Sequence, residues 1–385
     1  MKKIVHIMIS AFYIEGAGYQ ENLLPRAHKR MGMDVTIITS QYCFNSKNKV
    51  GSRPAGTYIN NDGIKVIVLE DNKRLPFISP FQNKCKNVKK TLVEEVPDLI
   101  FMHNIEYMDS REVAQYASKM KIPLFCDNHS DFYNTPSKGI LNLLLKHVLR
   151  IPLAKYISKR ARIIWGTTPW RVQYLQQYYK IPASKTDFLV MGADESLIHW
   201  DQRLKIRNDI RKKYGFQEED FLIITGGKIN KEKNIHILAR TVSKINRSNV
   251  KLLIFGDADE YVKKELDSCS NDHIKSIGWI NSNAVYDLFL ASDLGFFPGT
   301  HSVLWEQVVA CGLPAVFKYW DGMKHVDVNG NAILLKDISV ESIEYTIVNI
   351  LTDYSKYIQM RDNAITARNG FMYGTIARRS IGLQA

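Results

Sequence analysis

The richest group of potentially reactive residues follows a short apolar run, Leu294–Phe297. Pro298 and Gly299 end this predicted strand, and Ser302 can cap the helix that begins after it. The first turn of that helix carries a carboxylate, Glu306. Because the first amide groups of a helix are unpaired and lie at the positive end of its dipole, this turn suits an anionic ligand. An ordinary strand-to-helix turn of an α/β domain explains the same pattern.

A second candidate, Gly226–Asn234, places two lysines after a pair of glycines. Lys228 and Lys233 follow the predicted strand Phe221–Thr225, at the strand end where α/β domains bind ligands. Ammonium groups at such a place would pair with phosphate oxygens. A solvated charged loop is the alternative, although glycines at a strand end favour a site because they let the backbone approach a ligand closely.

The N-terminal half offers glycines and histidines at the ends of predicted strands. Gly16 and Gly18 follow the strand Ile4–Ile9, but the third glycine of the dinucleotide-binding fingerprint is missing. A tight turn therefore explains them as well as a phosphate contact does. His129 stands between two aspartates after another strand, and His103 holds a similar position. Either histidine could contact a substrate or transfer a proton, and a buried structural role is the alternative.

Neither the cysteines nor the acidic residues predict a metal centre. The five cysteines are far apart and form no CxxC pair, which is typical of a reducing compartment and of a chain without structural zinc. Asp257 and Asp259 form a D-x-D sequence, but they follow a predicted strand and suit a turn equally well. We therefore expect no metal ion and no resident cofactor.

Short apolar runs that alternate with amphipathic stretches must position these residues. A chain of 385 residues exceeds one ordinary core, and the alternation predicts two doubly wound α/β domains with parallel sheets. Unbroken apolar runs suit parallel strands that are covered on both faces. We place the domains at residues 1–195 and 196–385, the second ending in a helical tail. Two such domains would bring the carboxyl ends of both sheets to a central cleft.

The chain is basic, with a formal net charge of +13, which predicts an anionic partner such as a phosphorylated substrate or anionic lipid. No known motif supports nucleic acid. Apolar residues from Ile140 to Leu149 fall on one helical face, which suits either an anionic membrane surface or the cover of a domain. No apolar run has membrane-spanning length, and Ile4–Ile9 lacks a signal-peptide cleavage site. We therefore expect a cytoplasmic protein, with peripheral binding at the inner face of the membrane as a further option.

Several short motifs follow one another along the chain. Pro97–His103 reads P-D-L-I-F-M-H, Met191–Asp194 reads M-G-A-D, and Ala310–Pro314 reads A-C-G-L-P. Gly227–Asn234 resembles G-R-l-x-x-x-K-G, with lysine for the usual arginine and asparagine for the last glycine. Further matching segments are Arg26–Val35, Thr167–Thr168, Phe255–Asp257, Gly278–Ile280 and Ala291–Asp293. In this order, over nearly the whole chain, the motifs resemble the family 4 retaining glycosyltransferases, which have the GT-B fold.

The chain departs from that family at one point. The family usually carries E-x7-E before its A-C-G motif, with the second glutamate five residues ahead of the glycine. Here Gln307 holds that place, Glu306 stands one residue earlier, and no first glutamate is present. Donor-sugar contacts that belong to the first glutamate therefore do not transfer to this chain.

The resemblance implies a metal-independent, retaining, hexosyltransferase-type enzyme that uses a nucleotide diphosphate sugar as donor. It implies a lipid-linked or oligosaccharide acceptor in the synthesis of a bacterial surface polysaccharide such as capsule or lipopolysaccharide. The nucleotide would bind the C-terminal domain and the acceptor the N-terminal domain. A nucleotide-sugar epimerase of the same fold, or a catalytically inactive membrane-associated assembly protein, is the alternative.

The same comparison yields a set of expected site residues. Glu306 is expected to hold the ribose, with Gln307 as the alternative, and the Thr300–Val303 backbone to meet the diphosphate or sugar. The expected catalytic residues are His129, Lys228, Lys233 and Glu306. The residues expected to bind the nucleotide sugar are Gly16, Gly18, Gly227, Lys228, Lys233, Ile280, Thr300, His301, Ser302, Val303 and Glu306.

Overall fold

The computed structural model describes residues 1–9, 13–44, 50–72, 84–134, 144, 146–245 and 247–383. It divides into two compact units, of which the first is Met1–Val190 with Tyr373–Ala385 and the second is Met191–Met372. The division lies a few residues before the expected position, 195/196. The C-terminal helix, which we expected in the second domain, is part of the first unit.

The first unit is built on a sheet in which every described strand pair is parallel except β5 with β6. Its strands, in spatial order, are β10 (Thr186–Phe188), β9 (Ile163–Gly166), β8 (Leu124–Asn128), β7 (Leu99–Met102), β1 (Lys3–Met8), β2 (Asp34–Ser40), β6 (Lys65–Leu69) and β5 (Gly56–Ile59). Its helices are α1 (Gln20–Arg30), α2 (Val88–Glu95), α3 (Ser110–Lys119), α5 (Ile151–Ser158), α6 (Pro169–Gln177) and α14 (Tyr373–Ser380). β3 (Tyr42–Phe44) and β4 (Val50–Ser52) pair antiparallel in a separate two-stranded sheet.

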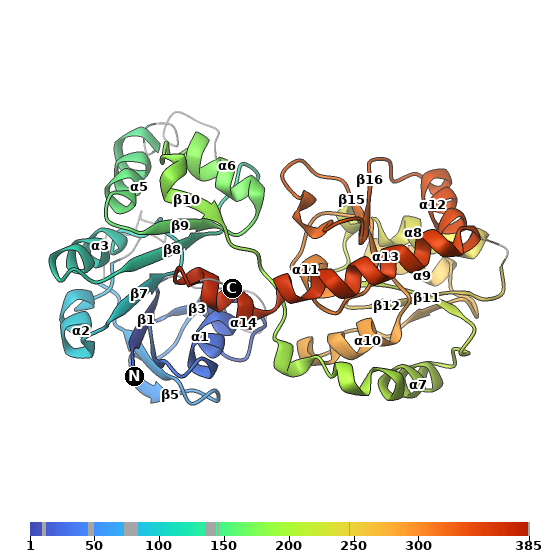
Figure 1. Cartoon of the computed structure of the whole chain (residues 1–385), viewed down its shortest axis with the longest axis horizontal. Helices are drawn as coiled ribbons and strands as arrows, with labels where there is room; N and C mark the ends of the chain where they lie inside the picture. Colours follow the sequence, from blue (N-terminus) through green and yellow to red (C-terminus); the bar gives the residue numbers. More distant parts are fainter. Residues whose placement is uncertain are drawn as a thin grey trace. The chain divides into compact units, whose positions relative to one another are not determined.

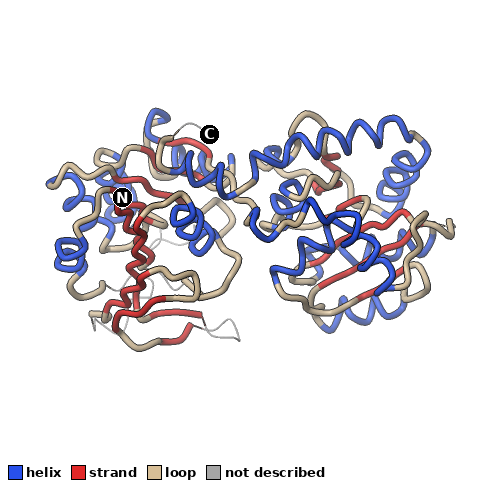
Figure 2. The backbone as a smooth tube through the Cα atoms, turned by 60° about the horizontal axis from the view of Figure 1, so that its bottom comes forward, coloured by secondary structure: helices blue, strands red, loops and turns tan. Residues whose placement is uncertain are grey.

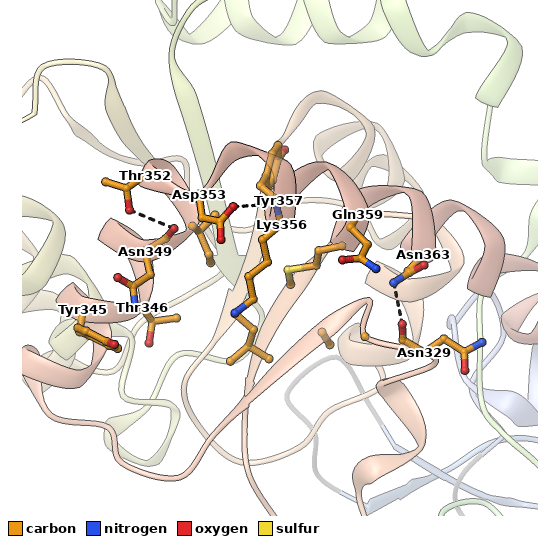
Figure 3. Close-up of a pocket in the computed structure, with 15 residues that line it drawn as sticks. Asn329, Tyr345, Thr346, Asn349, Thr352, Asp353, Lys356, Tyr357, Gln359 and Asn363 are labelled. Carbon is orange, nitrogen blue, oxygen red and sulfur yellow. Dashed lines mark hydrogen bonds between the residues drawn. The ribbon is translucent and has the colours of Figure 1, made fainter.

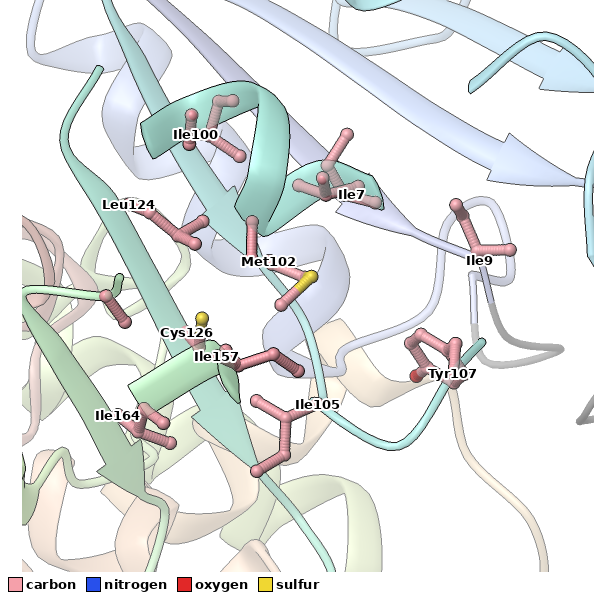
Figure 4. Packing of buried hydrophobic residues seen from close by; sticks show 14 of the residues in the cluster. Ile7, Ile9, Ile100, Met102, Ile105, Tyr107, Leu124, Cys126, Ile157 and Ile164 are labelled. Atoms are coloured by element: carbon pink, nitrogen blue, oxygen red, sulfur yellow. The ribbon is translucent and has the colours of Figure 1, made fainter. Parts of the chain in front are cut away.

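Apolar side chains on both faces of this sheet are buried, as the unbroken apolar runs predict. On one face Ile7, Met102 and Leu124 come from neighbouring strands and pack with Ile157 of α5 (Figure 4). On the other face α14 packs against α1 (Figure 1), and its Ile376 is buried in the same cluster as strand residues. α14 therefore covers part of this face of the first sheet.

The second unit contains an entirely parallel sheet with helices on both sides (Figure 2). Its strands, in spatial order, are β13 (Ile274–Ser276), β12 (Val250–Phe255), β11 (Phe221–Gly226), β14 (Leu294–Phe297), β15 (Ala315–Lys318) and β16 (Ala332–Leu335). Its helices are α7 (Arg203–Tyr214), α8 (Ile235–Lys244), α9 (Glu260–Ser268), α10 (Val285–Ala291), α11 (Leu304–Ala310), α12 (Val340–Thr352) and α13 (Tyr354–Ala367).

The strand order of each sheet reverses at one point. In the first unit β1 lies between β2 and β7, and in the second β11 lies between β12 and β14. The helical connections that follow such neighbouring strands lie on opposite faces of the sheet. A crevice therefore opens at the carboxyl ends of these strands. The segments that follow β1, β7, β11 and β14 are therefore where each unit can hold a ligand.

The predicted membrane-facing stripe lies largely outside the described residues, which omit 135–143 and 145. Of its described members, Leu144 and Val148 are exposed, and Lys146–Arg150 form a π-helical turn before α5. Across the described ranges, no helix combines the length and apolar character needed to cross a membrane.

Candidate functional site

The carboxyl ends of β11 and β12 approach each other so closely that only glycine fits. Gly256 has a φ of +111°, and a Cβ atom there would lie 1.9 Å from the carbonyl oxygen of Gly227. A Cβ on Gly226 would lie 2.3 Å from the carbonyl oxygen of Phe255. The glycine pair therefore forms a compact turn, and Lys228 follows it with an exposed side chain.

The loop after β14 is bound to the turn Lys231–Lys233. Lys233 Nζ donates hydrogen bonds to the carbonyl oxygens of Thr300 (2.7 Å) and His301 (3.4 Å). Asn234 Nδ2 donates to the carbonyl oxygen of Pro298 at 3.0 Å. Burial lowers the pKa of Lys233 from its usual value. The structure thus brings Lys233 and Thr300 together, two residues that the sequence predicts for the donor site, and Lys228 stands exposed on the turn before them.

Glu306 has partners that the sequence did not suggest. Its Oε1 accepts hydrogen bonds from Nε2 of His301 and from Nε2 of His325, each at 2.8 Å. The Glu306 side chain is completely buried, and among the described residues its Oε2 has no hydrogen-bond partner. Burial alone raises the pKa of Glu306, but the charge of His301 and the hydrogen bonds from both histidines outweigh it and hold the pKa well below its usual range.

The same three side chains could hold a divalent cation. Their ligand atoms lie within 4.8 Å of one another, and imidazole nitrogen with carboxylate oxygen is a donor set that suits zinc. Hydrogen bonds account for the observed contacts equally well, since both Nε2 atoms lie at ordinary hydrogen-bond distance from one oxygen. The arrangement therefore permits a metal ion without requiring one.

The buried position of Glu306 bears on the expected ribose contact. Glu306 is fully buried and Gln307 is only 6% exposed, so neither side chain presents an open surface to a ribose. The polar groups nearer to solvent belong to His301 and Ser302, which are partly exposed. Ile280 follows β13 at the same edge of the sheet and is also partly exposed.

The first unit carries a polar cluster at the ends of β7 and β8. Asp127 Oδ2 lies 2.9 Å from Nδ1 of His103 and 3.5 Å from Nε2 of His129. Gln20 Nε2 and the backbone amide of Asn104 donate to the two oxygens of Asp127 at 2.9 and 2.8 Å. Burial raises the pKa of Asp127, but the two histidines outweigh it and lower the pKa strongly. Asp127 is thus an anionic centre that orients both histidines.

His129 also lies 3.9 Å from the Glu21 carboxylate, and its side chain is 27% exposed. Burial lowers the pKa of His129, but the charge of Asp127 and then that of Glu21 outweigh burial and raise it. Gly16, with a φ of +76°, and Gly18 lie in the partly exposed turn before α1, as expected for the segment after β1. In the described part of the structure, neither glycine has a contact that indicates where a ligand binds.

A separate open cavity of about 610 Å³ lies against α12 and α13 (Figure 3). It is lined by amide, hydroxyl and aromatic side chains such as Asn349, Tyr345 and Gln359. Ala332 and Ile333, which also line it, begin β16. The cavity is therefore at the amino end of that strand, away from the carboxyl ends where the reactive groups gather.

Sequence reasoning missed His325, His6 and His28. His325 lies 19 residues after its partner Glu306, in a turn without a recognisable motif. His6 and His28 lie within a strand and a helix, where a single histidine resembles an ordinary core residue. The only available signal was the number of histidines at or near strand ends.

Residues 206–367, inside the second unit, match the family described as Glycosyl transferases group 1. No curated protein is detectably similar in sequence.

Several solved structures share the fold of the chain at low sequence identity. Anabaena HepE, crystallised with UDP and glucose, is 18% identical, with 98% of each chain covered and a TM-score of 0.67. WaaG, a glycosyltransferase involved in lipopolysaccharide biosynthesis, is 16% identical, with 98% of each chain covered and a TM-score of 0.61. The UDP-GlcNAc 2-epimerase of Neisseria meningitidis is 12% identical, with 98% of each chain covered and a TM-score of 0.62. The predicted GT-B architecture of two Rossmann-like domains is confirmed.

Proposed function

We propose that the chain is a retaining glycosyltransferase that moves a sugar from a nucleotide diphosphate sugar to a glycan acceptor. The observation that carries the proposal is the basic turn after β11, which is bound to the loop after β14 through Lys233. Both segments lie where the strand order of the second sheet reverses. The match of this unit to group 1 glycosyl transferases, and the UDP bound to HepE, support a nucleotide sugar as the donor.

The chemistry requires positive groups around the leaving diphosphate. When the bond between the sugar and the diphosphate breaks, negative charge grows on the leaving oxygen, and fixed donors aimed there lower the barrier. Lys228 is exposed and can pair with that oxygen, whereas Lys233 holds the loop whose amides and hydroxyls would face the phosphates. We propose that the anomeric configuration of the sugar is retained because the chain resembles a family of retaining enzymes.

Glu306 takes a different part in this account from the one we expected. Because both histidines point Nε2 at its carboxylate, Glu306 fixes the orientation of His301 and His325. We assign it as a positioning residue for His301, which lies in the loop beside Lys233. His301 then replaces the missing first glutamate of the family as the side chain that meets the donor.

We assign the acceptor to the first unit, around His129 and Asp127, by resemblance to the family. The net charge of +13 supports an acceptor that carries phosphate, such as a lipid-diphosphate-linked glycan. The similarity to WaaG supports a surface polysaccharide as the product. We place the protein in the cytoplasm, with the inner face of the membrane as the place where it would meet such an acceptor.

A thermal-shift screen with nucleotides and nucleotide sugars tests the donor assignment. A ligand that binds only the native state must raise Tm, so the matching nucleotide should give a saturable shift. Each positive donor is then incubated alone, with glycan acceptors, and with a chelator. We expect acceptor-dependent release of the nucleotide that survives the chelator. Epimerisation of the donor sugar without any acceptor would identify an epimerase, and the absence of binding would identify an inactive assembly protein.

A further inference from the structure

Three buried histidines of the first unit and the partly exposed His129 form one row that includes Asp127. His28 Nδ1 lies 3.0 Å from His6 Nε2, and His6 Nδ1 lies 3.0 Å from His103 Nε2. His103 Nδ1 then lies 2.9 Å from Asp127 Oδ2, which His129 faces from the other side at 3.5 Å. The row draws on α1, β1 and the segments after β7 and β8. Of these histidines only His129 reaches the surface, since His6, His28 and His103 are at most 2% exposed.

The far end of the row has a fixed hydrogen-bond polarity. His28 Nε2 lies 3.1 Å from the carbonyl oxygen of Ala377 in α14. The Ser380 hydroxyl also lies 3.2 Å from His28 Nε2, but it lies closer, at 2.8 Å, to the Ala377 carbonyl oxygen, to which it donates. A carbonyl can only accept, so His28 carries its proton on Nε2. Burial lowers the pKa of His28 to about 4, with a smaller opposing effect from the Ala377 carbonyl, so the ring is neutral at pH 7. Its Nδ1 is therefore an acceptor.

This polarity passes along the row. His6 must donate from Nε2 to His28, and burial followed by the neighbouring His28 and His103 lowers the pKa of His6 well below its usual value. His6 is therefore neutral, and its Nδ1 accepts a proton from Nε2 of His103. If His103 were also neutral, the lone pair on its Nδ1 would face a carboxylate oxygen at 2.9 Å. Two acceptors at that distance repel each other, so one more proton must lie between them.

We propose that the row holds this extra proton on Nδ1 of His103, and that His28, His6 and His103 are positioning residues for Asp127 and His129. Asp127 accepts hydrogen bonds from Gln20 and from the amide of Asn104, which favour its anionic form and leave the proton on the imidazole. His103 Nδ1 and Asp127 Oδ2 form a close ion pair, in which the N–H bond does not point directly at the oxygen.

The extra proton sets the electrostatic surroundings of His129. The charged groups around His129 are Asp127, Glu21 and Arg171. When His103 is protonated, its positive charge partly neutralises Asp127. Asp127 then raises the pKa of His129 less than it otherwise would. His129 presents Nε2 to Asp127 and Glu21, so Nδ1 is the nitrogen left for a ligand. This step rests on the proposed function in one respect, which is that His129 faces the acceptor.

Nitrogen NMR of the full-length protein with labelled histidine tests the proposal without a substrate. At pH 7.5 we expect one imidazolium with both nitrogens protonated, assigned to His103, and two neutral rings protonated on Nε2, assigned to His6 and His28. Single histidine substitutions supply the assignments. A neutral His103, or a row with the opposite tautomers, would overturn the proposal whatever the enzyme does.

The variant His6→Leu removes the acceptor for Nε2 of His103. His103 should then lose the extra proton and keep a single proton on Nδ1, toward Asp127. His273→Leu, in the second unit, is the matched control and should leave the His103 signals unchanged. The pH profile of transfer should shift in His6→Leu while nucleotide binding stays the same. An unchanged imidazolium signal in His6→Leu would contradict the proposal, and the wild-type spectrum decides the matter if this variant does not fold.

Discussion

Lys228 and Lys233 stand in the same turn but have different surroundings. Lys228 is exposed, whereas Lys233 is partly buried and donates to two carbonyl oxygens of the neighbouring loop. The first can therefore meet a ligand directly, and the second acts through the loop that it holds. Substitution of either lysine should reduce the binding of a diphosphate. The effect of the two substitutions on the stability of the protein should differ.

Substituting each lysine separately distinguishes the direct contact with a ligand from the indirect role through the loop. We expect Lys228→Ala to weaken nucleotide binding by roughly 2–4 kcal/mol, or about 30- to 1,000-fold, with an unchanged Tm of the free protein. Lys233→Ala should weaken binding and also lower Tm, because Thr300 and His301 lose their donor. Titration calorimetry with the nucleotide measures both. Lys231→Ala, an exposed lysine of the same turn, is the control, and equal affinities for all three variants would refute the assignment.

Glu306 should make stability depend on pH. Its pKa is lower in the folded protein than in the unfolded chain, so its contribution is complete above the ordinary carboxyl pKa and is lost as the pH falls through the folded value. At pH 7 Glu306→Gln should cost about 1–3 kcal/mol, because the two histidine donors lose a charged, buried acceptor.

Urea unfolding of wild type and Glu306→Gln at pH 7 and below pH 4 measures this difference, which should shrink at the acidic pH. Glu219→Gln, at an exposed carboxylate, should change stability by less than about 0.5 kcal/mol at either pH. A Glu306→Gln protein as stable as wild type at pH 7 would show that the two histidines do not depend on the carboxylate.

At the scale of elements, the contact between the loop after β14 and the turn Lys231–Lys233 leaves no room for a side chain. A Cβ atom on Gly299 would lie 2.3 Å from Cα and 2.5 Å from the carbonyl oxygen of Lys233. We expect Gly299→Ala to cost about 1–3 kcal/mol in stability and to weaken nucleotide binding, since the loop must move. Gly370→Ala, where a Cβ meets nothing within 4 Å, is the control. Unchanged calorimetric affinity in Gly299→Ala would separate this loop from the donor site.

The C-terminal helix α14 should stabilise the first unit, in which it is packed. Ile376 is 1% exposed, and Trp165 Nε1 donates to the carbonyl oxygen of Ser380 at 2.9 Å. Ile376→Ala should cost about 2–4 kcal/mol, because it leaves a cavity against α1 and the sheet. Chemical denaturation followed by tryptophan fluorescence measures the loss. Leu383→Ala, at a side chain that is 48% exposed, should have little effect, and similar losses in both variants would contradict the packing described.

Much of this architecture could be predicted from local pattern. The apolar runs Leu99–Met102 and Ile163–Gly166 coincide with β7 and β9, because a strand buried on both faces requires continuous apolar residues. The sheet that α14 covers could not be predicted. An amphipathic helix must bury one face, but its pattern does not identify the surface that receives it.

The candidate site was predictable only where a motif marks it. Lys228 and Lys233 follow glycines that the backbone requires, so their place at the strand end could be read from the sequence. The pairing of Glu306 with His325 depends on the path of the chain after β15. The row from His28 to His103 depends on the register of β1 with β2 and β7, which no short window of sequence contains.

At the scale of the whole molecule, the two units carry different chemistry. The second holds the basic turn proposed for the diphosphate, and the first holds the anionic Asp127 with its histidines. The net charge of +13 would attract an anionic donor or acceptor to both, and this attraction should weaken as salt screens it. Neither unit alone supplies the groups that the proposed transfer needs.

The most direct test of this account follows the anomeric proton of the sugar by NMR while the full-length protein acts on the donor that it binds most tightly. We predict that the nucleoside diphosphate is released and that the sugar, transferred to a glycan acceptor or slowly to water, first appears with the anomeric configuration of the donor. Substitution of Lys228 by alanine should slow this release. A first product of inverted configuration, an epimerised donor, or a donor left intact with every acceptor would contradict the central claim.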